Sequence, residues 1–236
     1  MKYDLRTRNL TYKKLKFIFD EIINDLRWSK RNSLEFQMAM VYIAFLYFFR
    51  MFNHYVGQFF ACTIMGVPVT RYDTHWYKIY LEYAASTFMQ EVIIVASGIL
   101  FNTLVFVFGF GLALVSKKCC SCFPRIYYKI ISWIGVFTML DPIFVLLVDI
   151  CSQSFILGDW FKLYHYYLVK ENSGIVGMYI TFFIMFSLTI FNGFLFYYYM
   201  IFIHMNGRIL DLYKRISGTL KSFFVPNDSE VSLRYL

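Results

Sequence analysis

The stretch FMQEVIIVASGILFNTLVFVFGFGLALVS at residues 88–116 decides the fold class of this chain. Glu91 is its single charged residue, and apolar side chains occupy most of the other positions. About 20 consecutive apolar residues are enough for an α-helix to cross the roughly 30 Å hydrocarbon core of a bilayer. Residues 88–116 are therefore predicted to form a transmembrane helix.

Three other apolar stretches lie outward from this one, at residues 34–69, 127–150 and 174–203. The stretch at 34–69 is longer than a straight span requires, so we expect it to tilt, break or project beyond the bilayer. Because proline lacks a backbone N–H, we expect a helix kink at Asp141-Pro142 and a freed carbonyl that Asn, Thr or water satisfies. The four stretches predict an all-α fold: a polytopic integral membrane helix bundle with about four transmembrane helices.

The composition also indicates a bilayer as the solvent. The chain is 59% hydrophobic, 22% aromatic and 16% charged, whereas soluble domains are nearer half apolar and a quarter charged. Its formal net charge of +8 comes from basic residues that flank the apolar stretches, not from a basic stripe on a polar domain. We therefore expect the lipid bilayer and other membrane proteins as partners, in a hetero- or homo-oligomer, and no nucleic acid.

The distribution of Lys and Arg predicts the orientation. Eighteen of them precede the first stretch, lie within residues 117–129 or follow the last stretch. The two other connecting segments hold four: Arg71, Lys78, Lys162 and Lys170. Since cytoplasmic loops carry the excess of basic residues, both termini are predicted to face the cytosol, which requires an even number of spans. Plasma membrane, endoplasmic reticulum and ciliary membrane all fit this pattern.

This pattern divides the chain into three regions: a cytosolic segment at 1–33, a four-span transmembrane domain at 34–204 and a cytosolic tail at 205–236. Apolar residues recur at helical spacing within 10–28 and 209–220, which predicts an amphipathic helix in each cytosolic region. The first of these helices is expected to lie among lipid headgroups or on the bundle, and the second on the membrane surface. The segments at 71–78 and 158–165 are predicted to be polar, aromatic loops.

Ionisable residues within the predicted spans are the least ordinary feature, because each costs a few kcal/mol there unless it is paired or hydrated. Residue counting from the cytosolic ends of the first and third spans puts Arg50 and Asp141 within about 3 Å of the same depth. Glu91 falls close to that depth, and His54 lies one helical turn from Arg50. We predict an intramembrane polar cluster in which Arg50 pairs with Asp141 or Glu91, with His54 nearby.

This cluster has three interpretations. It fixes the register of the helices, or Arg50 and Glu91 extend separately to the outer surface, or it lines a hydrated ion or solute pathway. Asn102 and Asn192 near midspan are predicted to form interhelical hydrogen bonds. Small residues predict close helix approaches and a central second helix, among them Ser97, Gly98, Gly111, Gly174 and Gly177.

Cys119, Cys120 and Cys122 follow the second span in a basic segment. Juxtamembrane cysteines of this kind are typical substrates of reversible S-acylation, which we predict here. Unmodified thiols fit the same pattern. Metal or redox use fits less well, because one C-x-x-C pair supplies at most two zinc ligands.

No pair of catalytic carboxylates, His-rich metal box, G-x-S-x-G turn or Gly-rich phosphate loop is present in the sequence. Asp73, His75 and His165 are scattered over the connecting segments, which favours interfacial polar residues over a catalytic site. We therefore expect no catalytic residues, no metal and no cofactor.

The leading hypothesis is a non-enzymatic multi-pass membrane subunit or scaffold that packs with partner membrane proteins in a larger complex. The alternative is a channel or transporter subunit whose polar cluster forms an ion or solute pathway.

Overall fold

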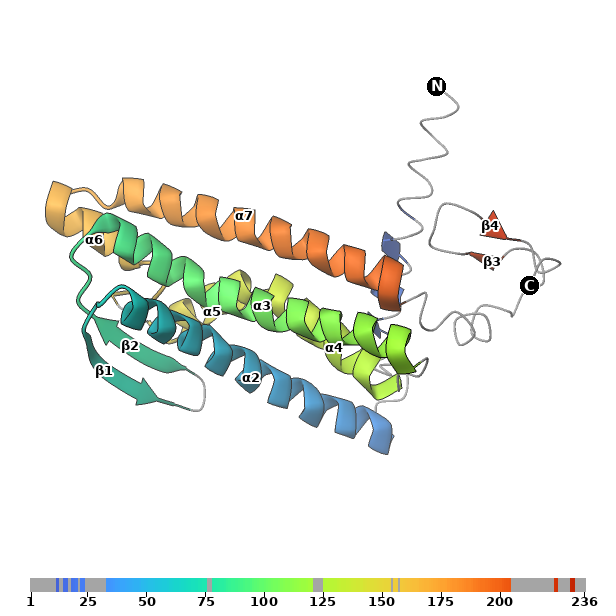
Figure 1. Cartoon of the computed structure of the whole chain (residues 1–236). Coiled ribbons are helices and arrows are strands. Elements are labelled where there is room, and N and C mark those ends of the chain that lie inside the picture. The colour runs from blue at the N-terminus through green and yellow to red at the C-terminus, as the bar shows by residue number, and fades with distance from the viewer. Residues whose placement is uncertain are drawn as a thin grey trace, which may run out of the picture. The chain divides into compact units, whose positions relative to one another are not determined.

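Long helices form most of the chain in the computed structural model (Figure 1). The structure describes residues 33–75, 78–120, 125–153, 155–156, 158–204, 223–224 and 230–231, together with several helical residues between 12 and 23. The helices are α2 (Leu34–Ile64), α3 (Phe88–Cys120), α4 (Arg125–Met139), α5 (Asp141–Cys151), α6 (Lys162–Glu171) and α7 (Ile175–Tyr199). A π-helical turn, η2 (Met200–His204), extends α7, and β3 (Phe223–Phe224) pairs with β4 (Glu230–Val231). The remainder of the predicted N-terminal helix and the predicted helix at 209–220 lie outside the described residues.

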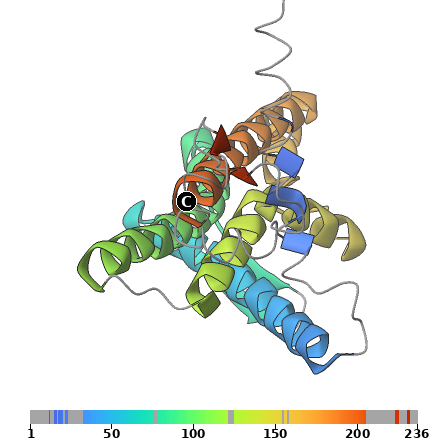
Figure 2. The same ribbon diagram turned by 90° about the vertical axis from the view of Figure 1, so that its right-hand side faces the viewer.

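Within the described residues, three helices are long and apolar enough to cross a membrane: Phe36–Ile64, Phe88–Ser116 and Ile175–His204. A fourth span results if α4 and α5 cross together, as Tyr127–Met139 and Asp141–Cys151 with a bend of 58° between them (Figure 2). The predicted fold class, a multi-pass membrane helix bundle, is thereby confirmed. The helix α2 ends at Ile64, so the helix breaks before the end of the apolar stretch at 34–69.

The bend between α4 and α5 follows from Pro142, the second residue of α5. An uninterrupted helix would bond the N–H of residue 142 to the carbonyl of Thr138, but proline has no N–H. That carbonyl instead accepts a hydrogen bond from Asn192 Nδ2 on α7 at 3.4 Å. Both the kink and the amide that satisfies the freed carbonyl agree with the expectation from the sequence.

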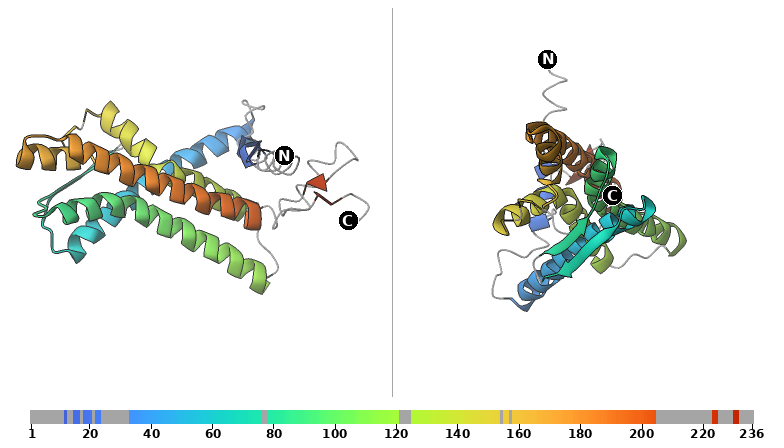
Figure 3. Two further views of the ribbon diagram at one scale, coloured as in Figure 1. Left: turned by 90° about the horizontal axis from the view of Figure 1, so that it is seen from above. Right: turned by 90° about the vertical axis from the view of Figure 1, so that its left-hand side faces the viewer.

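The segment at 71–78 is not the simple loop that the sequence predicted. It belongs to an antiparallel β-hairpin formed by β1 (Val69–Thr74) and β2 (Ile79–Tyr83), in which Tyr72 pairs with Leu81. Ile79 and Leu81 pack on Met51 and Tyr55, so the hairpin lies along α2 (Figures 1 and 3). Burial of alternate residues in β2 is a strand pattern, which a classification by polarity alone overlooks.

The segment at 158–165 is also not entirely loop, because it contains the start of α6. A Cβ atom on Gly177 would lie 2.2 Å from the carbonyl oxygen of Leu163, and one on Gly174 would lie 2.3 Å from the ring of Tyr164. Glycine at these positions is what lets α7 approach α6 so closely. The predicted close approach at Gly174 and Gly177 is confirmed.

The helix α3 is the most buried of the three long helices. Buried residues make up 39% of its most apolar segment, compared with 17% for α2 and 22% for α7, which confirms its predicted central position.

Contacts divide the chain into one unit of residues 1–42, 110–132 and 195–236 and another of residues 43–109 and 133–194. In the first unit, the hydroxyl of Tyr199 donates to the carbonyl of Tyr128 at 3.3 Å. The predicted polar cluster falls entirely within the second unit.

Candidate functional site

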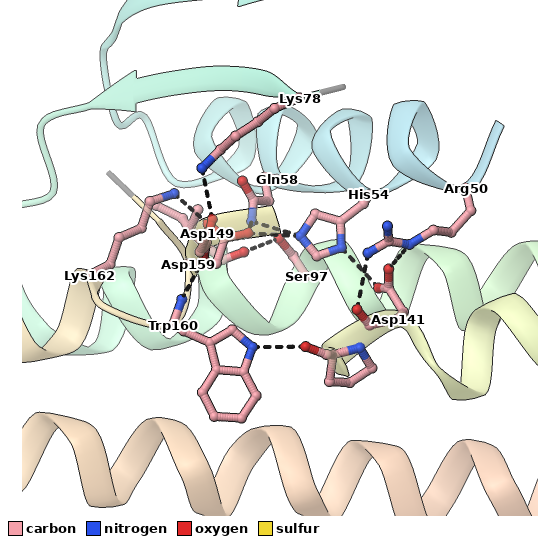
Figure 4. Close-up of polar contacts among 12 residues, drawn as sticks. Arg50, His54, Gln58, Lys78, Ser97, Asp141, Asp149, Asp159, Trp160 and Lys162 are labelled. Carbon is pink, nitrogen blue, oxygen red and sulfur yellow. Dashed lines mark hydrogen bonds and ion pairs between the residues drawn. The ribbon is translucent and has the colours of Figure 1, made fainter. Parts of the chain in front are cut away.

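Arg50 and Asp141 form a buried ion pair between α2 and the first residue of α5 (Figure 4). The Nε of Arg50 donates to Asp141 Oδ1, and its Nη2 donates to the backbone carbonyl of Asp141 at 3.0 Å. The rings of Tyr47 and Phe144 lie 5.8 Å and 5.4 Å from the guanidinium carbon, which suits cation–π attraction. The structure thus gives Arg50 one of the two partners that the depth comparison allowed.

His54 lies between two carboxylates. Its Nδ1 is 2.9 Å from Asp141 Oδ2, and its Nε2 is 2.9 Å from Asp159 Oδ2. Gln58 donates through Nε2 to the same Asp159 oxygen at 2.7 Å. Because Arg50, His54 and Gln58 are spaced by four residues, one face of α2 carries all three polar side chains.

Asp159 precedes α6 and accepts a second ion pair, from Lys162 Nζ at 2.7 Å. Burial by itself raises the pKa of the Asp159 carboxyl, but Lys162 and His54 outweigh burial and hold that pKa well below its usual range. The ammonium of Lys162 also lies 4.6 Å from the centre of the Tyr83 ring. The carboxylate of Asp159 therefore joins α2 to the segment that leads into α6.

A third buried ion pair joins the hairpin to α5. Lys78 Nζ donates to Asp149 Oδ1 at 2.7 Å, and the backbone N–H of Trp160 donates to Asp149 Oδ2 at 3.3 Å. The indole N–H of Trp160 donates to the carbonyl of Pro142 at 2.9 Å. The two ends of α5 are thus both held by residues from outside it.

These contacts form what we call the charge network, whose members are each at most 8% exposed: Arg50, His54, Lys78, Asp141, Asp149, Asp159 and Lys162. Without His54 it contains three basic and three acidic side chains, and each base contacts an acid. Removing an ion from water costs several kcal/mol unless a partner and hydrogen bonds compensate. Mutual pairing is what makes this degree of burial tolerable.

Two small cavities lie beside Arg50, each of about 10 Å³, which is roughly the room that one water molecule needs. His54, Lys78 and Asp149 line the first. Asn53, Asn102 and Thr138 line the second. The Nδ2 of Asn53 has no hydrogen-bond partner among the described residues, so a water molecule in the second cavity would satisfy it.

A larger cleft of about 500 Å³ opens beside α6, β2 and the first turn of α3. Glu91 lines this cleft and accepts a hydrogen bond from the hydroxyl of Tyr83 at 2.7 Å, so it is not part of the charge network. Burial, followed by the Glu91 carboxylate, raises the pKa of Tyr83 well above its usual value and keeps this donor neutral. Residue counting gave Glu91 a suitable depth but could not give the direction in which it points from the helix. Lys162 lines the cleft too and connects it to the charge network.

The other predicted site residues have separate environments. Asn192 accepts a hydrogen bond from Thr103 at 2.8 Å besides donating to Thr138, as an interhelical polar residue should. Asn102 is 3% exposed and borders the second small cavity. The backbone of Cys119 and Cys120 belongs to the last turn of α3, while their side chains, and Cys122 entirely, lie outside what the structure describes.

Sequence reasoning missed five members of the site: Gln58, Lys78, Asp149, Asp159 and Lys162. Two of them carry a signal. Asp149 is a second carboxylate within the stretch at 127–150, and Gln58 continues the four-residue spacing of Arg50 and His54. The other three belong to connecting segments, where a charged residue is ordinary and nothing in the sequence marks it as buried.

No protein-family model, curated protein or solved structure matches this chain.

Proposed function

We propose that this chain is a non-enzymatic multi-pass membrane subunit that packs with partner membrane proteins. The observation that carries the proposal is the small buried share of α2 and α7: within the described residues, 17% and 22% of their most apolar segments are buried. Their exposed faces bear stacked aromatic pairs, Phe45 with Phe49 and Phe182 with Phe186. Aromatic side chains offer large and rigid contact areas, which suits packing against another protein as well as against lipid.

The charge network supports the same proposal because its charges are used within the chain. Each of its three carboxylates has a cationic side chain as a partner. Two of these pairs join α2 and the hairpin to α5, and the contacts of Asp159 with His54 and Gln58 join α2 to the segment before α6, so these elements form one frame. A rigid frame presents its outer faces in a fixed geometry, which lowers the entropic cost of association.

Photo-crosslinking in native membranes tests this proposal. A benzophenone amino acid at Phe182 or Phe186, which share one exposed face of α7, should give the same discrete protein adduct, identified by mass spectrometry. The matched control is Met185, which is 1% exposed and should crosslink within the chain. Lipid adducts alone at both exposed positions, together with a monomer after extraction in mild detergent, would rule the proposal out.

S-acylation of Cys119, Cys120 and Cys122 is part of the proposal. Two observations support it: the backbone of Cys119 and Cys120 belongs to the last turn of α3, and the apolar span of this helix ends at Ser116, so an acyl chain there could reach the bilayer. Hydroxylamine-sensitive labelling of the protein from cells should disappear when all three are replaced by Ser. Cys151→Ser is the control and should leave the labelling unchanged, since this exposed cysteine lies at the other end of the bent pair.

A channel or transporter subunit is the second candidate, and the succession of polar groups favours it. Lys162 borders the open cleft and contacts Asp159, and His54 continues from there to Asp141. Arg50 then borders the second small cavity. Ionisable groups arranged in series are typical of proton pathways.

Reconstitution into liposomes tests the second candidate. Proton entry should quench a trapped pH-sensitive dye in vesicles that contain the wild-type chain. Asn102→Leu should abolish the signal because it fills the second small cavity with apolar atoms. Ser187→Ala, at an exposed position on α7, should leave it unchanged. Wild-type vesicles without flux of protons, ions or solutes would exclude this candidate.

A further inference from the structure

His54 has a carboxylate oxygen 2.9 Å from each of its ring nitrogens (Figure 4). A neutral imidazole carries one N–H and one lone pair. With a single proton the ring would donate to Asp141 or to Asp159 and point its lone pair at the other oxygen. Gln58 Nε2 lies 3.2 Å from His54 Nε2, but its amide already donates to Asp159 Oδ2 at 2.7 Å, so a lone pair on Nε2 would still face that oxygen. The ring is 1% exposed, so this repulsion would not be screened by bulk water.

Neither carboxylate is placed to supply the missing proton. Asp141 Oδ1 accepts from Arg50, Asp159 Oδ1 accepts from Lys162, and Asp159 Oδ2 also accepts from Gln58. Neighbouring cations and donated hydrogen bonds favour the ionised form of a carboxyl group. A proton on either carboxylate would compete with these donors, which leaves the imidazole as its place.

The ring also has little freedom to turn away from this arrangement. A Cβ atom on Gly98 of α3 would lie 2.5 Å from His54 Nε2, so the backbone of α3 covers one side of the imidazole. The ring of Tyr55 lies 5.3 Å from it, centre to centre. Both ring nitrogens are therefore held toward their carboxylates.

We infer that His54 is a proton-binding site: the imidazole holds a second proton, taken from water as the bundle assembles, and donates one N–H to Asp141 and the other to Asp159. The titratable and charged groups around the ring come from α2, the hairpin, α5, the segment before α6, and α6 itself: Arg50, Tyr55, Lys78, Asp141, Asp149, Asp159 and Lys162. Loss of the proton turns one of the two hydrogen bonds into a repulsion. The bound proton thus stabilises the contact between α2 and the segment around Asp159. This inference does not depend on which of the two proposed functions is correct.

The wild-type protein in bilayers, labelled with ¹⁵N-histidine, provides the test by solid-state NMR. At pH 8 the His54 ring should show two protonated nitrogens. Gln58→Leu should keep both His54 N–H signals, because in the proposal the N–H at Nε2 donates to the Asp159 carboxylate and does not need the Gln58 amide. Asp159→Asn should lose one of them.

Each outcome decides the assignment. A single His54 N–H in the wild-type spectrum at pH 8 would overturn it, without reference to the folding of any variant. Loss of the second N–H in Gln58→Leu would also overturn it, since the second proton would then depend on Gln58 and not on Asp159. Two His54 N–H signals that persist in Asp159→Asn would likewise overturn it, since the second proton on the ring would then not depend on the Asp159 carboxylate.

Discussion

The carboxylate of Asp141 contacts two basic side chains: Arg50 at Oδ1 and His54 at Oδ2. Removing one partner of a buried ion pair leaves the other charge uncompensated, at a cost of about 3–5 kcal/mol. We expect Arg50→Met and Asp141→Asn each to lower the free energy of unfolding by about this amount. The double variant should lose less than the sum, by about 1–3 kcal/mol. Unfolding in mixed micelles measures all three, and strictly additive losses would disprove the coupling.

Two cations of the hairpin make a matched comparison. Lys78 is 2% exposed and pairs with Asp149, whereas the Arg71 side chain is 63% exposed and pairs with Asp73. Lys78→Met should destabilise the protein by about 3 kcal/mol or more, because Asp149 stays buried without its cation. Arg71→Met should change stability by less than about 1 kcal/mol, because water screens the exposed pair. Equal effects in the same unfolding assay would mean that Lys78 is hydrated in the folded protein.

Asp159 predicts how stability responds to acid. The pKa of Asp159 is lowered in the folded protein, so its ionised carboxylate contributes fully to stability above its pKa in the unfolded chain, about 4. This contribution is lost as the pH falls through the lowered pKa of the folded protein. The stability difference between the wild type and Asp159→Asn should therefore be largest above about pH 5 and shrink below about pH 4. Unfolding measured across this range checks the sign. A difference that widens on acidification would contradict it.

At the scale of elements, the long helices were predictable because an apolar run of that length has few alternatives to a membrane span. The kink was predictable from Pro142 for an equally local reason. The partner of Glu91 was not predictable. Its depth in the bilayer follows from counting residues, whereas the direction in which its side chain points depends on how α3 packs. The hairpin was missed because the buried residues Ile79 and Leu81 stand in a segment that is otherwise polar and aromatic.

Two glycines of α3 test the packing of that helix. A Cβ on Gly98 would collide with the His54 ring, whereas a Cβ on Gly111 would meet no atom of the described residues within 4 Å. Gly98→Ala should therefore destabilise the protein and displace the ring from its carboxylates. Gly111→Ala should be neutral or stabilising by up to about 1 kcal/mol, because alanine favours helix more than glycine does. Thermal unfolding in detergent compares them, and equal effects would show that His54 does not rest on α3.

At the scale of the whole molecule, the number of spans depends on whether α4 and α5 cross the bilayer together. Within the second unit, the end of α5 lies against the hairpin through Lys78 and Asp149. The hairpin follows α2, and α6 follows α5, so the two connecting segments meet at one end of this unit (Figures 1 and 3). We predict that α4 and α5 form one bent span, because the distribution of Lys and Arg along the chain requires an even number of spans.

Site-directed labelling can decide this point in a variant whose native cysteines are replaced. Thr74→Cys on the hairpin and Ser173→Cys before α7 should react with an impermeant maleimide from the same side of the membrane. Ser33→Cys, before α2, should react from the opposite side, which the excess of Lys and Arg predicts to be cytosolic. Each position should become reactive from both sides once the membrane is permeabilised, which controls for buried thiols. Labelling of positions 74 and 173 from opposite sides would make α4 and α5 a re-entrant loop, reduce the spans to three and place the two termini on different sides.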